Sequence, residues 1–168
     1  MDNLKNQVAK LLDELELKYN INEKKHRFEL DETSDNVAVS INLYYDEGCN
    51  GLYNLSCLTF NLPKERTTAL LHEINKIHND YSSIAHFYLD PDNNRIGLQS
   101  VIYVPETGID KDVFICFLSE PIQILDENYD EIMKVSFGPD DIAKHAIDAV
   151  DGGMAETDDN GNTDKEEK

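Results

Sequence analysis

One acidic segment of the sequence has the residue types of a calcium site. Residues 90–94 read Asp-Pro-Asp-Asn-Asn, which resembles the first ligand positions of a calcium loop. The sixth position of such a loop should be glycine and the twelfth glutamate, but these positions hold Arg95 and Val101. Aspartate, proline and asparagine also form turns through their backbone preferences. The sequence therefore predicts a hairpin turn here and no calcium site.

The histidines and cysteines could bind zinc or act in catalysis, but their spacing favours neither. His72 and His78 lie six residues apart, whereas a zinc pair on one helix needs the i, i+4 spacing or a matching third ligand. His86 and His145 have no ligand-type partner close in the sequence. The three cysteines lack the spacing of a metal knuckle or a redox pair, and no nucleophile elbow or glycine-rich phosphate loop is present. We expect no catalytic residue, no metal and no cofactor, and we expect His78 to be a packing residue.

The charge of the chain limits the partners that it can have. Its 168 residues include 34 acidic and 15 basic side chains, which gives a formal net charge of -19. Such a field repels a phosphate backbone, so we expect no nucleic-acid partner. A basic or apolar partner is favoured, although the charge could also serve only to keep the protein soluble. No signal peptide and no apolar run of ~20 residues is visible, so we expect a cytoplasmic protein that does not enter the membrane.

The apolar residues recur with the periods of helices and strands, in the order α-β-β-β-α-β-β-α. This order predicts an α+β domain over residues 1–133, with a mainly antiparallel five-stranded sheet. A shorter helix is expected over 134–151, followed by a disordered acidic tail over 152–168. Helices are expected over 3–19, from Asn61 to about 81, and over about 113–132, where Pro121 should kink or split the helix. Strands are expected near 28–30 and over 37–45, 52–60, 84–89 and 96–104.

Three residues of this framework carry a family resemblance. Pro63 lies near the start of the second helix, Asn75 lies near its end, and Gly108 opens the last helix. With the hairpin that follows the second helix, this pattern resembles the YbjN family, described as putative bacterial sensory transduction regulators, over roughly residues 4–133. A second asparagine is typical three residues after the first, where this chain has His78. The resemblance implies the fold of type III secretion chaperones and a role in regulation or in chaperone-like binding of another protein. It implies no catalytic residues.

Three tyrosines are out of phase with the predicted core of the sheet. Tyr44 points away from the face formed by Val39 and Leu43, and Tyr53 and Tyr103 can share its side. Tyrosine is favoured at interfaces because it buries area and keeps a polar group. We therefore predict that Tyr44, Tyr53 and Tyr103 form a protein-binding surface, although a terminal helix or a second subunit could cover it permanently.

These observations favour a non-catalytic regulatory or chaperone-like module that binds a protein partner or a second copy of itself in a homodimer. Two alternatives stay open at this point. An immunity-type protein that neutralises a basic toxin would also be small and acidic, and a small enzyme would need titratable groups that converge in a pocket.

Overall fold

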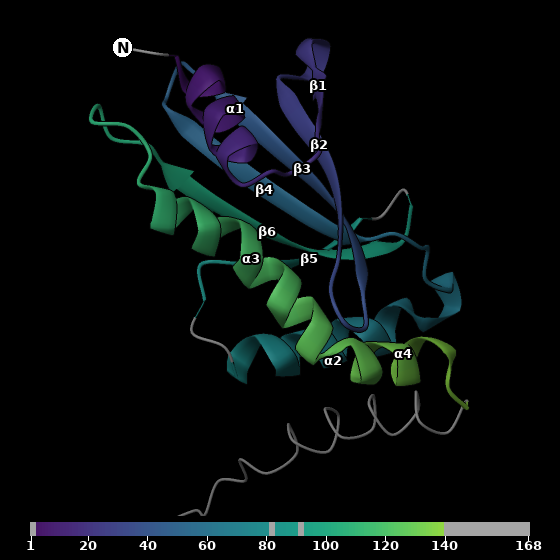
Figure 1. The fold of residues 1–168 in the computed structure, drawn as a ribbon. Helices are drawn as coiled ribbons and strands as arrows, with labels where there is room; N and C mark the ends of the chain where they lie inside the picture. The colour runs from purple at the N-terminus through teal and green to yellow at the C-terminus, as the bar shows by residue number, and fades with distance from the viewer. Residues whose placement is uncertain (1–2, 81–82, 91–92, 140–168) are drawn as a thin grey trace, which may run out of the picture.

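The computed structural model describes residues 3–80, 83–90 and 93–139, which form one antiparallel sheet with four helices. The strand order is β1-β2-β3-β4-β6-β5, and every neighbouring pair is antiparallel. Figure 1 shows α1 and α3 lying across one face of the sheet, while α2 and α4 lie together at one end. The helices are α1 (Leu4–Glu14), α2 (Thr67–Asp80), α3 (Lys111–Glu127) and α4 (Tyr129–Phe137). The strands are β1 (Asn20–Asn22), β2 (Arg27–Thr33), β3 (Ala38–Asp46), β4 (Gly51–Leu58), β5 (His86–Asp90) and β6 (Arg95–Tyr103).

The predicted α+β class and antiparallel sheet are confirmed, but the sheet has six strands where five were expected. The additional strand is β1, which is three residues long and reads Asn-Ile-Asn. A segment this short and polar shows no alternation of apolar residues, so the sequence pattern missed it. The first helix was expected to reach residue 19 but ends at Glu14, and Glu16 has a positive φ of 57°. That left-handed residue turns the chain out of the helix and towards β1.

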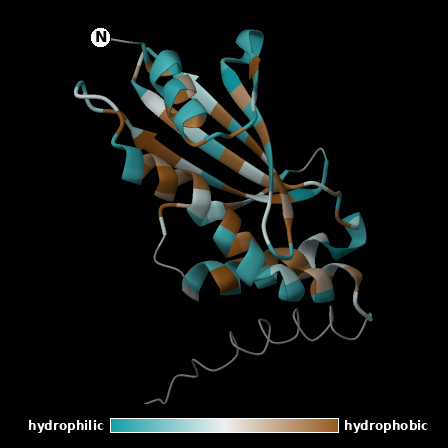
Figure 2. Cartoon of the chain, in the orientation of Figure 1, coloured by the Kyte–Doolittle hydropathy of each residue, from teal (hydrophilic) through white to brown (hydrophobic). Residues whose placement is uncertain are grey.

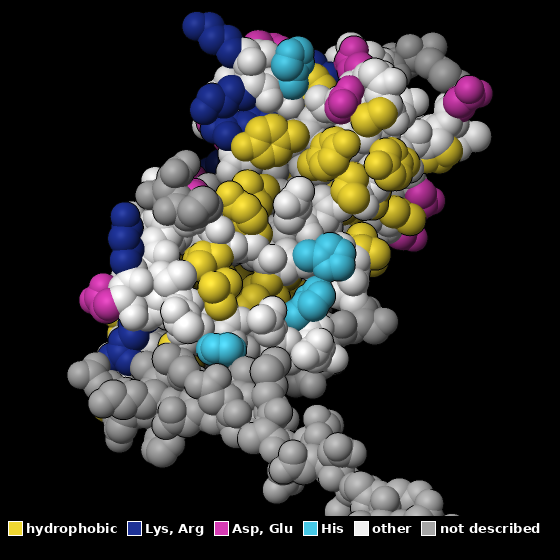
Figure 3. All heavy atoms as spheres, turned by 180° about the vertical axis from the view of Figure 1, so that it is seen from behind, with side chains coloured by type: hydrophobic (Ala, Val, Ile, Leu, Met, Phe, Trp, Pro, Cys, Tyr) yellow, Lys and Arg dark blue, Asp and Glu magenta, His cyan; other side chains and the backbone are white. Residues whose placement is uncertain are grey.

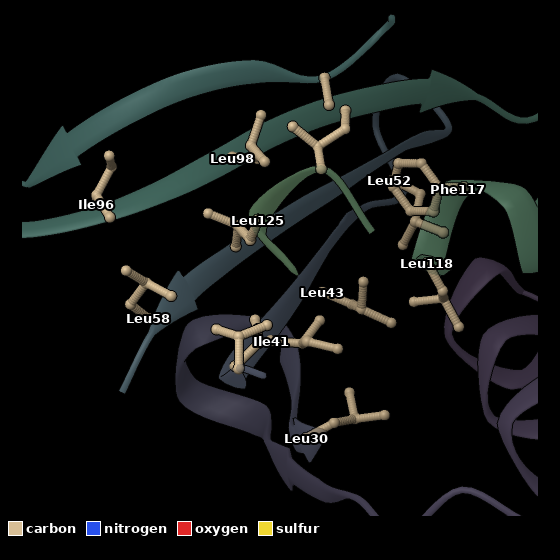
Figure 4. Packing of buried hydrophobic residues seen from close by; sticks show 14 of the residues in the cluster. Leu30, Ile41, Leu43, Leu52, Leu58, Ile96, Leu98, Phe117, Leu118 and Leu125 are labelled. Carbon is tan, nitrogen blue, oxygen red and sulfur yellow. The ribbon is translucent and has the colours of Figure 1, made fainter. Parts of the chain in front are cut away.

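The core lies between the sheet and the helices α1 and α3. Figure 2 shows apolar and polar residues alternating along the strands. Apolar residues from four adjacent strands point to the same side, where Phe117, Leu118 and Leu125 of α3 meet them (Figure 4). The alternation predicted for β3 is confirmed, since Val39, Ile41, Leu43 and Tyr45 are all buried.

Pro121 was expected to kink the third helix or to split it in two, and the structure shows no split at this residue. It lies inside α3, and the chain leaves that helix at Asn128 instead, where α4 follows. Proline has no backbone N–H, so the carbonyl of Phe117 lacks its usual partner four residues later. The buried side chain of Asn54 supplies the missing donor, because its Nδ2 donates to the Phe117 oxygen at 2.9 Å. Ser56 in turn donates to Oδ1 of Asn54 at 2.8 Å, so the buried amide is bonded on both sides.

The predicted hairpin of β5 and β6 is present, with Tyr88 opposite Gly97 and Asp90 opposite Arg95. The Asp90 carboxylate accepts bonds from the backbone N–H and the side chain of Asn93 at 3.3 and 2.8 Å, as in an aspartate-initiated turn. Gly97 is needed at this pairing, since a Cβ there would lie 2.5 Å from the Ser56 backbone oxygen.

Part of the predicted domain organisation lies outside the described residues. Of the helix expected over 134–151, the structure describes 134–139, where α4 ends at Phe137. The tail expected over 152–168 and His145 fall in the range that is not described.

Candidate protein-binding face

The register of the strands brings the predicted tyrosines onto one side of the sheet. Tyr44 of β3 lies directly opposite Tyr53 of β4, and Tyr53 lies opposite Val101 of β6. Tyr103 follows two residues after Val101, opposite Gly51. Because side chains alternate along a strand, all of these point away from the core that faces α1 and α3. Leu55 occupies the next position of β4 on the same side.

We call this set of five side chains the tyrosine face: Tyr44, Tyr53, Leu55, Val101 and Tyr103. Tyr103 is 71% exposed and Val101 38% exposed, while the others are half-buried by their neighbours. Figure 3 views the sheet from the side opposite α1 and α3, and hydrophobic side chains gather over it. Lysine and arginine border this gathering at one margin and histidine at another (Figure 3). The face is therefore an aromatic surface with a polar rim, which is the composition of many protein interfaces.

Arg27 fixes the orientation of one aromatic ring. Its guanidinium lies 5.5 Å from the centre of the Tyr44 ring, and its Nη1 donates to the Tyr44 hydroxyl at 2.8 Å. The same side chain pairs with Glu29 at 2.6 Å. Burial opposes the charge on Arg27, but its bonds to Glu29 and Tyr44 outweigh burial and raise the pKa of the guanidinium. Tyr44 is thus held in place before any partner arrives, which lowers the entropy cost of binding.

A hollow of about 470 Å³ opens at one end of the tyrosine face, between the rings of Tyr44 and Tyr53 and the turn after β3. The rings of Tyr44 and Tyr53 form the apolar part of its lining. The charged and polar part of the lining comes from Lys25, His26, Asp46 and Glu47. The hollow is large enough to receive a side chain of a partner, with hydrogen-bonding groups at its margin.

The thiols near this face differ in exposure. Cys57 is buried, and that burial raises the pKa of its thiol to about 11, so it remains protonated near neutral pH. Cys49 is exposed and lies 3.8 Å from the Tyr53 hydroxyl. This contact is the main cause of a raised pKa for the Tyr53 hydroxyl.

The fold brings two histidines together that the sequence separates. The rings of His78 on α2 and His86 on β5 lie 5.2 Å apart, between centroids. His78 is half-buried, in keeping with the packing role expected for it. Within residues 3–80, 83–90 and 93–139, no group of three or more histidine, cysteine or acidic side chains is arranged to hold a metal ion.

The three motif residues lie away from the tyrosine face. Pro63 begins a short 3₁₀ turn over Lys64–Arg66, and α2 starts only at Thr67, so Pro63 is not in the first turn of that helix. Asn75 is exposed on α2. Gly108 has a φ of 99°, which favours glycine, and it precedes α3, whose cap is Asp110.

The sequence pattern missed a buried asparagine that joins two loops. Nδ2 of Asn94 donates to the carbonyl of Leu62 at 2.6 Å, and the Leu62 N–H donates to the Asn94 oxygen at 2.8 Å. Asn94 also has a φ of 50°, a conformation that asparagine tolerates better than most residues. In the sequence, only its position directly before a predicted strand could have indicated that Asn94 has a structural role.

None of the helices in the described part of the chain combines the length and the apolar character required to span a bilayer.

Comparisons with known proteins agree with this architecture. One solved structure with the same fold is "YbjN, a putative transcription regulator from E. coli", with a TM-score of 0.55 and 13% identity over 73% of this chain and 86% of that one. Another is a chain of the ExsC-ExsE complex, with a TM-score of 0.54 and 14% identity over 76% of this chain and 94% of that one. No curated protein matches the sequence. Residues 5–134 match the YbjN family, whose description is "putative bacterial sensory transduction regulator". The expected fold of type III secretion chaperones is confirmed by these likenesses, and the chain belongs to the YbjN family.

Proposed function

We propose that this protein is a non-catalytic regulatory or chaperone-like module that binds another protein chain through the tyrosine face. The observation that carries the proposal is the exposure of aromatic and aliphatic side chains on the sheet face opposite α1 and α3. Membership of a family described as regulators supports it, as does the fold shared with a chain of the ExsC-ExsE complex, which is itself an assembly of two proteins.

The chemistry of the face suits a protein partner. Tyrosine and arginine are enriched among the residues that carry most of the binding energy at interfaces, and Tyr44, Tyr53 and Arg27 lie in contact or directly opposite one another here. The partner would place apolar side chains over Val101 and Tyr103 and one side chain in the hollow beside Tyr53. A second copy of this chain could meet the same requirements and would give a symmetric homodimer.

Changing Tyr44 and Tyr103 together to serine should weaken association strongly while the monomer stays folded. Aromatic anchors at an interface often contribute about 2 kcal/mol or more each. Light scattering measures self-association, and a pull-down from the source cell with mass spectrometry measures capture of a partner. Circular dichroism serves as the folding control.

The matched control replaces two exposed apolar residues elsewhere, Leu71 of α2 and Val113 of α3, with serine. This variant removes similar apolar exposure from the surface and should associate as the parent does. Because Tyr44 is half-buried, Tyr103→Ser alone provides a variant that changes only an exposed ring. If the folded variants assemble and capture partners as the parent protein does, the tyrosine face is not the binding site.

A further inference from the structure

Strand β2 has an outer edge that β1 covers only in part. β1 pairs with Arg27–Glu29, and in the described part of the chain no strand pairs with the outer edge at Asp31 or Thr33. Figure 1 shows this second half of β2 at the margin of the sheet. It is an unpaired strand edge, and such edges bind additional strands.

The hydrogen-bond pattern shows which backbone groups are available. Tyr45 N–H donates to the His26 oxygen, and Ser34 N–H donates to the Val37 oxygen, so the even-numbered residues between them bond to β3. The N–H and C=O groups of Asp31 and Thr33 therefore point outward. Together they offer two donors and two acceptors to an added strand.

An apolar groove of about 270 Å³ runs beside this edge, on the side of the sheet that faces the helices. Ile115 is 37% exposed at its opening, so a side chain from outside can reach it. The aliphatic residues of the lining come from the segment after α1, from β2 and β3, and from α3: Leu15, Leu17, Leu30, Ile41, Ile115, Leu118 and Ile122. An added strand on β2 would direct every second side chain into this groove.

The charge around the groove indicates which segment fits. Glu32 lines the groove and Asp31 lies on the opposite side of the same strand. Neither side chain has an ion pair with any residue in the described ranges, and the whole chain carries a net charge of -19. A segment that approaches this edge is favoured when it carries lysine or arginine.

We propose that the outer edge of β2 and the adjacent groove form a second binding site, which takes an extended segment of a partner protein as an added antiparallel or parallel strand. Aliphatic side chains of that segment fill the groove against Ile115 and Leu30. Its lysine or arginine side chains point to the other side of the sheet and pair with Asp31, while Glu32 adds to the negative charge beside the groove. This site is separate from the tyrosine face, because its groove opens on the other side of the sheet.

The test uses the full-length protein and a fluorescein-labelled nine-residue peptide in which isoleucine alternates with lysine. Fluorescence polarisation at 150 mM salt should show saturable binding. Ile115→Ser should weaken this binding about tenfold, since it removes apolar contact area at the opening of the groove. Val113→Ser changes an exposed residue of the same helix that does not line the groove, and it should leave the affinity within about twofold.

Two altered peptides separate strand addition from attraction by charge alone. A peptide of the same composition, with its lysines grouped at one end, keeps the charge but loses the alternation, and it should bind at least about tenfold more weakly. A version with an N-methyl group on every backbone nitrogen cannot donate from either edge of the peptide, so it should also bind at least about tenfold more weakly than the original peptide. The proposal is wrong if the original peptide does not bind, if both altered peptides bind as well as it does, or if Ile115→Ser and Val113→Ser have equal effects. The double variant Tyr44→Ser, Tyr103→Ser should bind the peptide with the affinity of the parent protein. The proposal for the β2 edge can therefore be tested independently of the proposal for the tyrosine face.

Discussion

Replacing Ile41 by alanine should lower the free energy of unfolding by about 2–5 kcal/mol. Ile41 is 1% exposed at the middle of β3, where Leu30 of β2 and Ser56 of β4 are its direct neighbours across the sheet. Removing three side-chain carbons there loses their transfer energy and leaves a cavity that two flanking strands prevent from closing. Urea unfolding followed by circular dichroism measures the change, with an unchanged m-value showing that the unfolded state is the same.

Ser40→Ala is the matched control for this prediction. Ser40 is the preceding residue of the same strand, half-buried on the side of the tyrosine face and opposite Cys57 of β4. Its replacement removes one hydroxyl and creates no cavity in the core, so it should cost less than about 1 kcal/mol. Similar costs for Ile41→Ala and Ser40→Ala would contradict the assignment of the two faces of the sheet.

Replacing Asn54 by alanine should lower the free energy of unfolding by about 2–4 kcal/mol. Asn54 is fully buried, and its amide satisfies both the Phe117 carbonyl and the Ser56 hydroxyl. The variant leaves the Phe117 oxygen without the donor that Pro121 also cannot provide, and each unsatisfied buried group is costly.

A double-mutant cycle with Pro121→Ala tests this cause directly. Alanine at position 121 restores a backbone N–H that can donate to the Phe117 oxygen within α3. In that background, Asn54→Ala should cost about 1 kcal/mol less than in the parent protein. Additive effects of the two changes, measured by the same urea unfolding, would show that the carbonyl of Phe117 does not link Asn54 to Pro121.

Several features of the fold could be predicted because they are local. The strict alternation over Val39–Tyr45 specifies a strand with one buried face, and the turn residues 90–94 between two alternating segments specify a hairpin. The same alternation placed Tyr44, Tyr53 and Tyr103 out of phase with the core, which is where the strand register has them. Binding by this face remains a prediction.

Other features depend on contacts between residues far apart in the chain. In β4 the polar residues Asn54 and Ser56 face the core, which an apolar pattern does not predict. Asn54 is buried there because it donates to the carbonyl of Phe117, more than sixty residues away, which Pro121 leaves without a donor. The short strand β1 exists because β2 provides a partner, since three polar residues have no strand pattern of their own.

The sequence by itself therefore determined the periodic elements, the acidic character and the resemblance to the YbjN family, because each depends on residue type and short-range spacing. Only the tertiary structure decided which strand edge stays open, how Pro121 is accommodated and that His78 meets His86. Each of these results from the relative placement of whole strands and helices, which the pairing of the sheet and the packing of its core settle together.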